Sequence, residues 1–293
     1  MFVTGAGDVR MQSSVVAIRL AALRAGRGLS MKAAAEAAGL NTSTIFRIEH
    51  GLVAPRESTV RLLLELYGEG EHAPRLISLL RGERAPGWYD APAVPLGLSE
   101  LLELEDAARV ISTYCPGHVP PLLQTRAYAE SAARCALPPG PPGIAAGQAA
   151  RAVELTARRQ QVLDRRHGPH LWAVLGRAAL LDQPLPRAED RLAQLDALAL
   201  AAGQPRVAVQ VARPAAVTGH LYQGPPFTLL RFPDDPPGAG RCDVLVLHLL
   251  HGPVVVTDRR HVEEHRHAFA RLALAAHPAD ATPRALDELR LTA

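Results

Sequence analysis

The sequence is poor in several features, and each shortage excludes a class of protein. No stretch approaches the roughly 18 consecutive apolar residues of a membrane-spanning helix. No charged segment followed by an apolar one opens the chain, so a secretory signal is not expected. The three cysteines, Cys115, Cys135 and Cys242, are scattered and form no CxxC pair, which argues against a disulfide framework and a zinc knuckle. We therefore expect a protein of the reducing cytoplasm, without a membrane partner.

The basic residues are unusual in kind and in position. Lys32 is the only lysine and Asn41 the only asparagine among 293 residues. This bias is typical of a GC-rich genome, so the excess of arginine alone is weak support for a nucleic-acid partner. Residues 1–67, however, carry eight Arg and Lys against five Asp and Glu, whereas the remainder carries 24 of each. The whole net charge of +3 lies in the first quarter of the chain, which favours a polyanionic partner there.

The hydrophobic pattern divides the chain into four parts. Residues 1–12 are aperiodic and predict a disordered tail. Residues 13–82 predict an all-α helix-turn-helix bundle, and residues 83–98, which contain three prolines, predict a linker. Residues 99–293 predict an α+β domain, because clustered strand patterns follow runs of helical ones. We find no internal repeat.

The helical part contains five short patterns with clear start and stop signals. Ser30 and Asn41 are good N-cap residues, and Gly26, Gly39 and Gly51 follow helices that they would end. The expected helices cover residues 13–26, 31–38, 42–50, 56–67 and 72–81.

Two of these helices form a unit with a tight turn at Gly39-Leu40-Asn41. On the second helix, Ile45 and Ile48 lie on the inner side. The outer side carries Thr42, Ser43, Phe46 and Arg47. Small hydroxyls near a helix N-terminus, with a long arginine donor one turn later, suit a helix lying in a DNA major groove. The helix N-terminus also favours a phosphate.

This segment resembles the phage-repressor-like helix-turn-helix regulators of the xenobiotic-response-element class over about residues 15–67. The matching positions are Arg24, Gly28-Leu29-Ser30, Ala35, Gly39-Leu40-Asn41, Thr44-Ile45, Arg47-Ile48-Glu49 and Gly51. The resemblance implies that Thr42, Ser43 and Arg47 face bases. It also implies phosphate contacts by Thr44 and Arg56, and a structural salt bridge between Arg24 and Glu49.

Three positions depart from this class. Met31 stands where the family usually has Gln, Ala34 replaces a usual Leu, and Phe46 replaces a usual Ser. The loss of Gln should weaken one contact, whereas Phe46 is able to pack on a thymine methyl group. We therefore keep Phe46 among the expected DNA-binding residues.

The larger part of the chain mixes helical and strand patterns. The order of elements predicts an α+β arrangement and not a repeating βαβ sheet, with a loop at Leu137–Gly143 and a hairpin at Gly252-Pro253. Helices are expected over residues 99–113, 122–135, 147–166, 187–202, 260–276 and 284–291. Strands are expected over residues 171–175, 207–212, 227–232, 242–250 and 254–257.

A second resemblance covers about residues 87–289. The run Val119-Pro120-Pro121-Leu122-Leu123-Gln124-Thr125, followed by Tyr128-Ala129, is similar to a signature of the antitoxin-like C-terminal domain of helix-turn-helix regulators from high-GC Gram-positive bacteria. Later matches are Arg158-Arg159-Gln160, Ala178-Ala179-Leu180, Gln194-Leu195, Val209-Gln210-Val211, Gly219-His220 and Phe227. The resemblance implies regulation of a neighbouring gene, often one that encodes a small partner protein, and implies no reaction.

The chain departs from this second pattern at acidic positions. Gly176-Arg177 stands where Asp-Glu is usual, and Leu247-His248 where Tyr-x-Glu is usual. Gln124, Thr125 and Tyr128 have two interpretations: a helix N-terminus with core packing, or a polar pocket or partner surface for regulation.

A different pattern opens an enzymatic alternative. His261-Val262-Glu263-Glu264-His265 matches H-x-x-E-H, whose two histidines at i and i+4 are able to bind zinc in a metal-dependent hydrolase. The plainer interpretation is the exposed polar face of a helix whose Val262, Phe269 and Leu272 point inward. A third alternative is an antitoxin or adaptor that acts by protein contact alone.

The preferred interpretation is a cytoplasmic, sequence-specific DNA-binding transcriptional regulator that is not an enzyme and uses no cofactor or metal. It would bind a double-stranded operator as a homodimer, with two recognition helices ~34 Å apart. The C-terminal domain would dimerise, sense a ligand or bind a small protein encoded next door.

Overall fold

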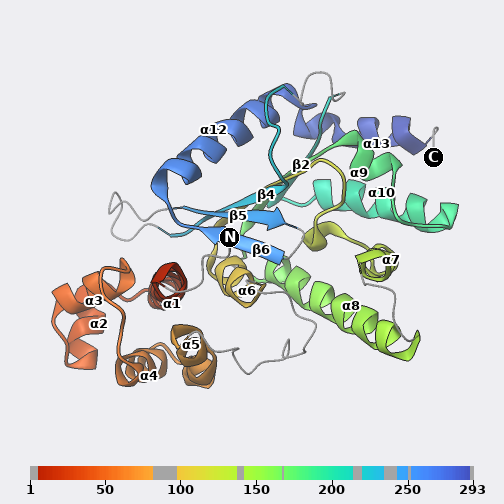
Figure 1. Cartoon of the computed structure of the whole chain (residues 1–293). Coiled ribbons are helices and arrows are strands. Elements are labelled where there is room, and N and C mark those ends of the chain that lie inside the picture. The colour runs from red at the N-terminus through yellow and green to blue at the C-terminus, as the bar shows by residue number, and fades with distance from the viewer. Residues whose placement is uncertain are drawn as a thin grey trace. The chain divides into compact units, whose positions relative to one another are not determined.

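The computed structural model describes residues 6–81, 98–136, 142–166, 168–213, 220–233, 243–249 and 252–290 (Figure 1). The chain divides into two compact units, which are described here each by itself. The first comprises residues 1–109, 230–244 and 250–259, and the second comprises residues 110–229, 245–249 and 260–293.

Short helices build most of the first unit. They are α1 (Ala6–Gly26), α2 (Met31–Ala38), α3 (Thr42–Glu49), α4 (Glu57–Leu66), the 3-10 turn η1 (Gly70–His72), α5 (Ala73–Leu80) and α6 (Leu98–Ala107). The core between α1 to α5 is made of fully buried apolar side chains, among them Leu20, Ile45, Leu63, Leu64 and Leu76. In and directly after α4, the buried side chains of Val60, Leu63, Leu64 and Tyr67 lie three or four positions apart, which is the spacing of an inward helical face.

Helix α6 and strand β6 (Gly252–Val256) also belong to the first unit, where α6 packs on α1 and beside β6. Charged side chains hold α6 in place. Arg19 of α1 lies 3.3 Å from the carboxylate of Glu103 and also contacts Asp106, and Arg75 of α5 contacts Glu103. The sequence assigns residues 99–107 to the C-terminal domain, whereas here they share a unit with the helix-turn-helix bundle.

The remaining elements belong wholly or mostly to the second unit. They are β1 (Val110–Cys115), η2 (Pro121–Leu123), α7 (Arg126–Ala136), α8 (Pro142–Asp164), β2 (His170–Leu175), α9 (Arg177–Leu181), α10 (Ala188–Ala202), β3 (Val207–Val211), β4 (Phe227–Arg231), β5 (Val244–Leu249), α12 (Arg259–Ala275), η3 (Ala279–Ala281) and α13 (Thr282–Arg290).

The strands form one six-stranded sheet in the order β3-β2-β1-β4-β5-β6. Strands β1, β2 and β3 are parallel, with Val110 opposite His170 and Leu171 opposite Val207. Strand β4 is antiparallel to β1. The Arg109 N–H, just before β1, donates to the Arg231 carbonyl at the end of β4, whereas the Thr113 hydroxyl, farther along β1, donates to the Phe227 carbonyl at the start of β4. The sheet is therefore mixed.

Helices flank the sheet on both sides (Figure 1). Phe269 of α12 makes edge-to-face contacts with Trp172 of β2 and Phe227 of β4, so α12 packs on one face of the sheet. Helix α8 lies on the opposite side, next to α7 and η2. The fold class expected from the sequence, a helical bundle followed by an α+β region, is confirmed.

Some local predictions were wrong. Residues 6–12, expected in a disordered tail, form the first turns of α1, because no proline separates them from the helix and extending a helix costs less than starting one. The helix expected over residues 99–113 ends at Ala107. Residues 110–113 instead form the first part of the mostly buried strand β1, which suits β-branched Val110, Ile111 and Thr113.

The sequence also underestimated the parallel part of the sheet. Strands β1, β2 and β3 are joined by helical crossovers, so βαβ units are present where none was expected. Helix α9 was missed because it is only five residues long. Helix α8 begins at Pro142, inside the predicted Leu137–Gly143 loop, where proline suits the first turn. Residues 137–141 and the expected linker, except residue 98, lie outside the described residues.

Within the described part of the chain, every helix is too short or too polar to cross a lipid bilayer.

Candidate nucleic-acid interface

Two well-capped helices build the helix-turn-helix. At the start of α2, the Ser30 hydroxyl accepts a hydrogen bond from the Ala33 N–H at 3.1 Å. At its end, Gly39 has φ +65°, and the Leu40 N–H reaches back to the Ala35 carbonyl at 2.9 Å. A left-handed residue here is natural for glycine, and it turns the chain directly into α3. Asn41 occupies the N-cap position of α3, but its side chain makes no capping hydrogen bond.

Helix α3 has a buried side and an exposed side. Ile45, Ile48 and Glu49 are buried. Thr42, Ser43, Phe46 and Arg47 are exposed, and Thr44 is half-buried. The structure therefore brings the expected base-facing residues together on one solvent-facing surface, which we call the α3 surface.

A fully buried ion pair fixes α3 against α1. The Arg24 guanidinium donates through Nε and Nη2 to the two carboxylate oxygens of Glu49, at 2.7 and 2.8 Å. Its Nη1 donates to the Leu29 carbonyl at 2.6 Å. Burial, and the negative charge of Glu49 in this pair, raise the pKa of the Tyr67 hydroxyl, so the phenol stays neutral. The Arg24–Glu49 pair determines the orientation of α3, because two parallel hydrogen bonds between the guanidinium and the carboxylate allow little rotation of the helix.

Aromatic and basic groups complete the α3 surface. The Phe46 ring stacks on the His50 ring with centroids 4.0 Å apart, and His50 Nδ1 is 2.8 Å from the Phe46 carbonyl. Arg56 is exposed at the N-cap position of α4. Neither Arg47 nor Arg56 makes an ion pair with any residue that the structure describes, so both guanidinium groups face solvent. Sequence analysis missed His50, although its spacing from Phe46 is that of helical neighbours.

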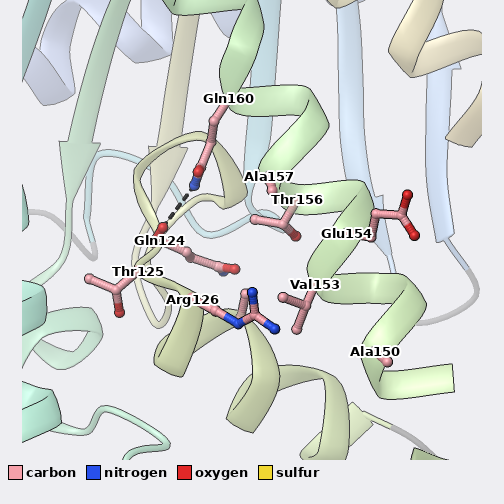
Figure 2. Close-up of a pocket in the computed structure, with 10 residues that line it drawn as sticks. Gln124, Thr125, Arg126, Ala150, Val153, Glu154, Thr156, Ala157 and Gln160 are labelled. Carbon is pink, nitrogen blue, oxygen red and sulfur yellow. Dashed lines mark hydrogen bonds between the residues drawn. The ribbon is translucent and has the colours of Figure 1, made fainter. Parts of the chain in front are cut away.

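A second candidate site lies in the second unit, between α7 and α8. A cavity of about 420 Å³ is lined by Gln124, Thr125, Arg126, Ala129, Ala150, Val153, Glu154, Thr156, Ala157 and Gln160 (Figure 2). Gln124 and Thr125 therefore line a pocket, whereas Tyr128 is buried and does not line it. A regulatory role for these three residues stays a prediction.

The segment before α7 is held by side-chain amides. Gln194 accepts from the Thr125 N–H at 2.7 Å and donates to the Leu123 carbonyl at 2.9 Å. Gln160 donates to the Gln124 carbonyl at 2.7 Å (Figure 2). The Tyr128 hydroxyl accepts from the Val119 N–H at 3.0 Å. Gln160 and Gln194 were not predicted as site residues, although both belong to the matched family positions.

A row of polar groups crosses the sheet near the end of β1. Thr113 Oγ1 lies 3.6 Å from the Cys115 sulfur and 3.0 Å from Thr228 Oγ1, which in turn lies 2.9 Å from His248 Nε2. Burial raises the pKa of the Cys115 thiol to about 12. Burial, together with the charges of Arg159 and His118, lowers the pKa of His248 to about 4. Both groups are neutral at pH 7, so this row contains no thiolate nucleophile.

Two histidines of α12 have partners within the protein. His265 Nδ1 lies 2.8 Å from the His261 carbonyl, and its Nε2 lies 3.3 Å from the Tyr222 hydroxyl. Both ring nitrogens are therefore occupied. His267 pairs with Glu263 at 3.1 Å. The one group of three potential metal ligands among the described residues is Glu69, Glu71 and His72, a partly exposed cluster at η1.

Comparison with known proteins gives matches to both parts of the chain. The family profile described as "Domain of unknown function (DUF5753)" matches residues 98–288, and that described as "Helix-turn-helix domain" matches residues 15–76. The HTH-type transcriptional regulators PuuR of Escherichia coli (strain K12) and of Shigella flexneri are each 36% identical over 86 residues. That region is 29% of this chain, and the chain spans only 42% of the length of these relatives. No solved structure matches the chain.

Proposed function

Because the chain belongs to the DUF5753 family and carries a helix-turn-helix domain, we propose that it is a sequence-specific DNA-binding transcriptional regulator. The observation that carries this proposal is the α3 surface. Its polar and basic side chains are exposed together, on a helix whose orientation is fixed by the buried Arg24–Glu49 pair. A rigid helix presenting its N-terminal side chains is what major-groove recognition needs.

Each residue of the α3 surface has a role in this proposal. Thr42, Ser43, Phe46 and Arg47 contact base edges, and the Arg47 guanidinium suits the two acceptors of guanine. Thr44 and Arg56 contact phosphates and set the register on the duplex. The domain belongs, in this proposal, to the xenobiotic-response-element class, and no catalytic role is assigned to any residue.

The proposal extends to assembly and control. A homodimer would place two α3 helices ~34 Å apart, on successive turns of a palindromic operator. The DUF5753 part, residues 98–288, would supply the antitoxin-like function: a dimer contact, a ligand site or a surface for a small partner protein. Its pocket between α7 and α8 supports the ligand-sensing alternative.

The experiment that tests the proposal selects bound duplexes and then separates base contacts from phosphate contacts. Full-length protein is used to enrich bound fragments of its source genome, and the affinity for an enriched duplex is compared with that for a scrambled one. Arg47→Ala is expected to lose about 1–3 kcal/mol of discrimination between the two duplexes. Arg56→Ala is expected to weaken both equally and to reduce the salt slope by about 1.

Arg284→Ala is the matched control, because Arg284 is an exposed arginine on α13, paired with Glu288, far along the chain from α3. It should bind both duplexes as the unmodified protein does. Failure of any duplex to bind at low salt would overturn the proposed function. Unchanged discrimination in Arg47→Ala would remove Arg47 as the base-contacting residue.

A further inference from the structure

The pocket between α7 and α8 has walls of different chemistry. Val153, Ala129, Ala150 and Ala157 give it an apolar lining of small side chains. Its polar side chains come equally from two segments: Gln124, Thr125 and Arg126 from the η2–α7 junction, and Glu154, Thr156 and Gln160 from α8. Gln124 and Arg126 reach across the space toward α8 (Figure 2). Apolar surface combined with fixed polar groups is the usual form of a small-molecule site.

One polar group of the pocket is a cation without a partner. Figure 2 shows the Arg126 side chain pointing into the pocket, beside Val153. Across the described residues Arg126 makes no ion pair. Glu154 also lines the pocket, but its carboxylate is turned away from Arg126 in Figure 2 and accepts from Arg158 at 2.6 Å. The pocket therefore presents a positive charge that no carboxylate of its own wall neutralises.

The side chains of Gln124 and Gln160 are held by hydrogen bonds from their amide nitrogens, which leaves their amide oxygens available as acceptors. Gln160 Nε2 donates to the carbonyls of Pro121 and Gln124, at 2.9 and 2.7 Å, so both of its N–H groups are used. Gln124 Nε2 donates to the Val119 carbonyl at 2.8 Å. An amide whose nitrogen is committed to the backbone offers its oxygen as an acceptor. The pocket thus combines a cationic donor with neutral acceptors.

We infer that this pocket binds a small organic acid that carries its own N–H or O–H donor, such as an amino acid or a hydroxy acid. The guanidinium of Arg126 pairs with the carboxylate, because its planar fork matches two carboxylate oxygens. The amine or hydroxyl of the ligand donates to the Gln124 oxygen, and its apolar part lies against Val153 and Ala157. Calling this ligand an effector rests on the proposed regulatory function, whereas the binding itself does not.

The wall that presents these groups is already ordered. Gln194 holds the backbone at Leu123 and Thr125, and Thr125 Oγ1 accepts from the Tyr128 N–H at 3.2 Å as the cap of α7. Because these contacts are all made within the protein, binding requires little ordering of this wall. The effect of a ligand should therefore appear directly as a gain in thermal stability.

The test measures the melting temperature of the full-length protein with a defined panel of probes. The panel contains the common L-amino acids, glycolate and L-lactate, each beside its primary amide, in which the carboxylate is replaced by a neutral carboxamide. At least one acid is expected to raise Tm by about 2–4 °C at saturation, and its amide is expected to leave Tm unchanged. Arg126→Met should abolish the response. Ala157→Leu, which fills the pocket and keeps the charge, should abolish it as well.

Arg134→Ala is the matched control, because Arg134 is an exposed arginine of the same helix, paired with Glu130 outside the pocket. This variant should respond as the unmodified protein does. Three results would overturn the inference: no acid of the panel raises Tm, acid and amide act alike, or Arg126→Met keeps the response. Duplex binding by the same protein samples is measured separately, so a failure of the regulator proposal is distinguishable from a failure of the pocket.

Discussion

At the scale of single residues, the position of α3 depends on one buried pair. Arg24 and Glu49 are 25 residues apart and both are fully buried, so each charge depends on the other for compensation. The pair was expected only from the family resemblance, since neither composition nor periodicity says which arginine is buried. Buried pairs of this kind cost much when one partner is removed and little when both are replaced.

We predict that Arg24→Met lowers the stability of the helix-turn-helix by about 3–5 kcal/mol, because Glu49 would remain as a buried, unpaired charge. Hydrogen exchange of the α1 and α3 amides measures this change. The double variant Arg24→Met/Glu49→Leu should recover most of the protection. Lys32→Ala, which removes an exposed ion pair with Glu36, should change exchange very little. If the α1 and α3 amides of Arg24→Met were as well protected from exchange as those of the unmodified protein, the prediction would be contradicted.

At the scale of elements, local chemistry decided what could be predicted. The bounds of α2 were predicted correctly because Ser30 and Gly39 mark them through their own backbone geometry. Strand β1 was mistaken for the end of a helix, because its place in the middle of a sheet depends on distant strands. The pocket illustrates the same limit. Gln124 and Thr125 were considered, but Gln160 comes from another helix and joins them only in the fold.

Helix α3 leads to a prediction about base preference. The Phe46 ring is 40% exposed and is held by its stack on His50, so it offers a fixed apolar surface. In the selected duplex, replacing the contacted thymine by deoxyuridine removes one methyl group. We expect a loss of about 0.8 kcal/mol, or roughly fourfold in affinity.

Binding titrations of thymine and deoxyuridine duplexes measure this difference. Phe46→Ser should bind both duplexes equally, and the same substitution at a thymine outside the α3 footprint serves as control. A fourfold preference that survives in Phe46→Ser would show that another side chain contacts the methyl group.

At the scale of the whole molecule, the segment matched to DUF5753 begins with a helix that packs in the same unit as the helix-turn-helix. Residues 98–107 form α6, and Glu103 of α6 is contacted by Arg19 of α1 and Arg75 of α5. Linkers usually separate domains where few contacts cross, and here charged contacts do cross. The domain boundaries expected from the sequence stay a prediction.

We predict that Glu103→Gln loosens α6 from the bundle, because the buried Arg19 and the half-buried Arg75 lose their shared carboxylate. Faster hydrogen exchange of the α6 amides and of the middle of α1 would measure the effect. Asp106 still pairs with Arg19, so the loss should stay below the roughly 3–5 kcal/mol of a completely broken pair. Glu154→Gln removes an exposed pair with Arg158 and serves as control. Unchanged α6 exchange in Glu103→Gln would contradict a stabilising role.

The outermost strand of the sheet limits how copies of this chain are able to associate. Strand β6 ends the strand order, carries Pro253, and packs beside α6. Proline has no N–H to offer a neighbouring strand, and proline at a sheet border is a natural protection against edge-to-edge aggregation. Growth into a continuous intermolecular sheet is therefore disfavoured at the β6 border.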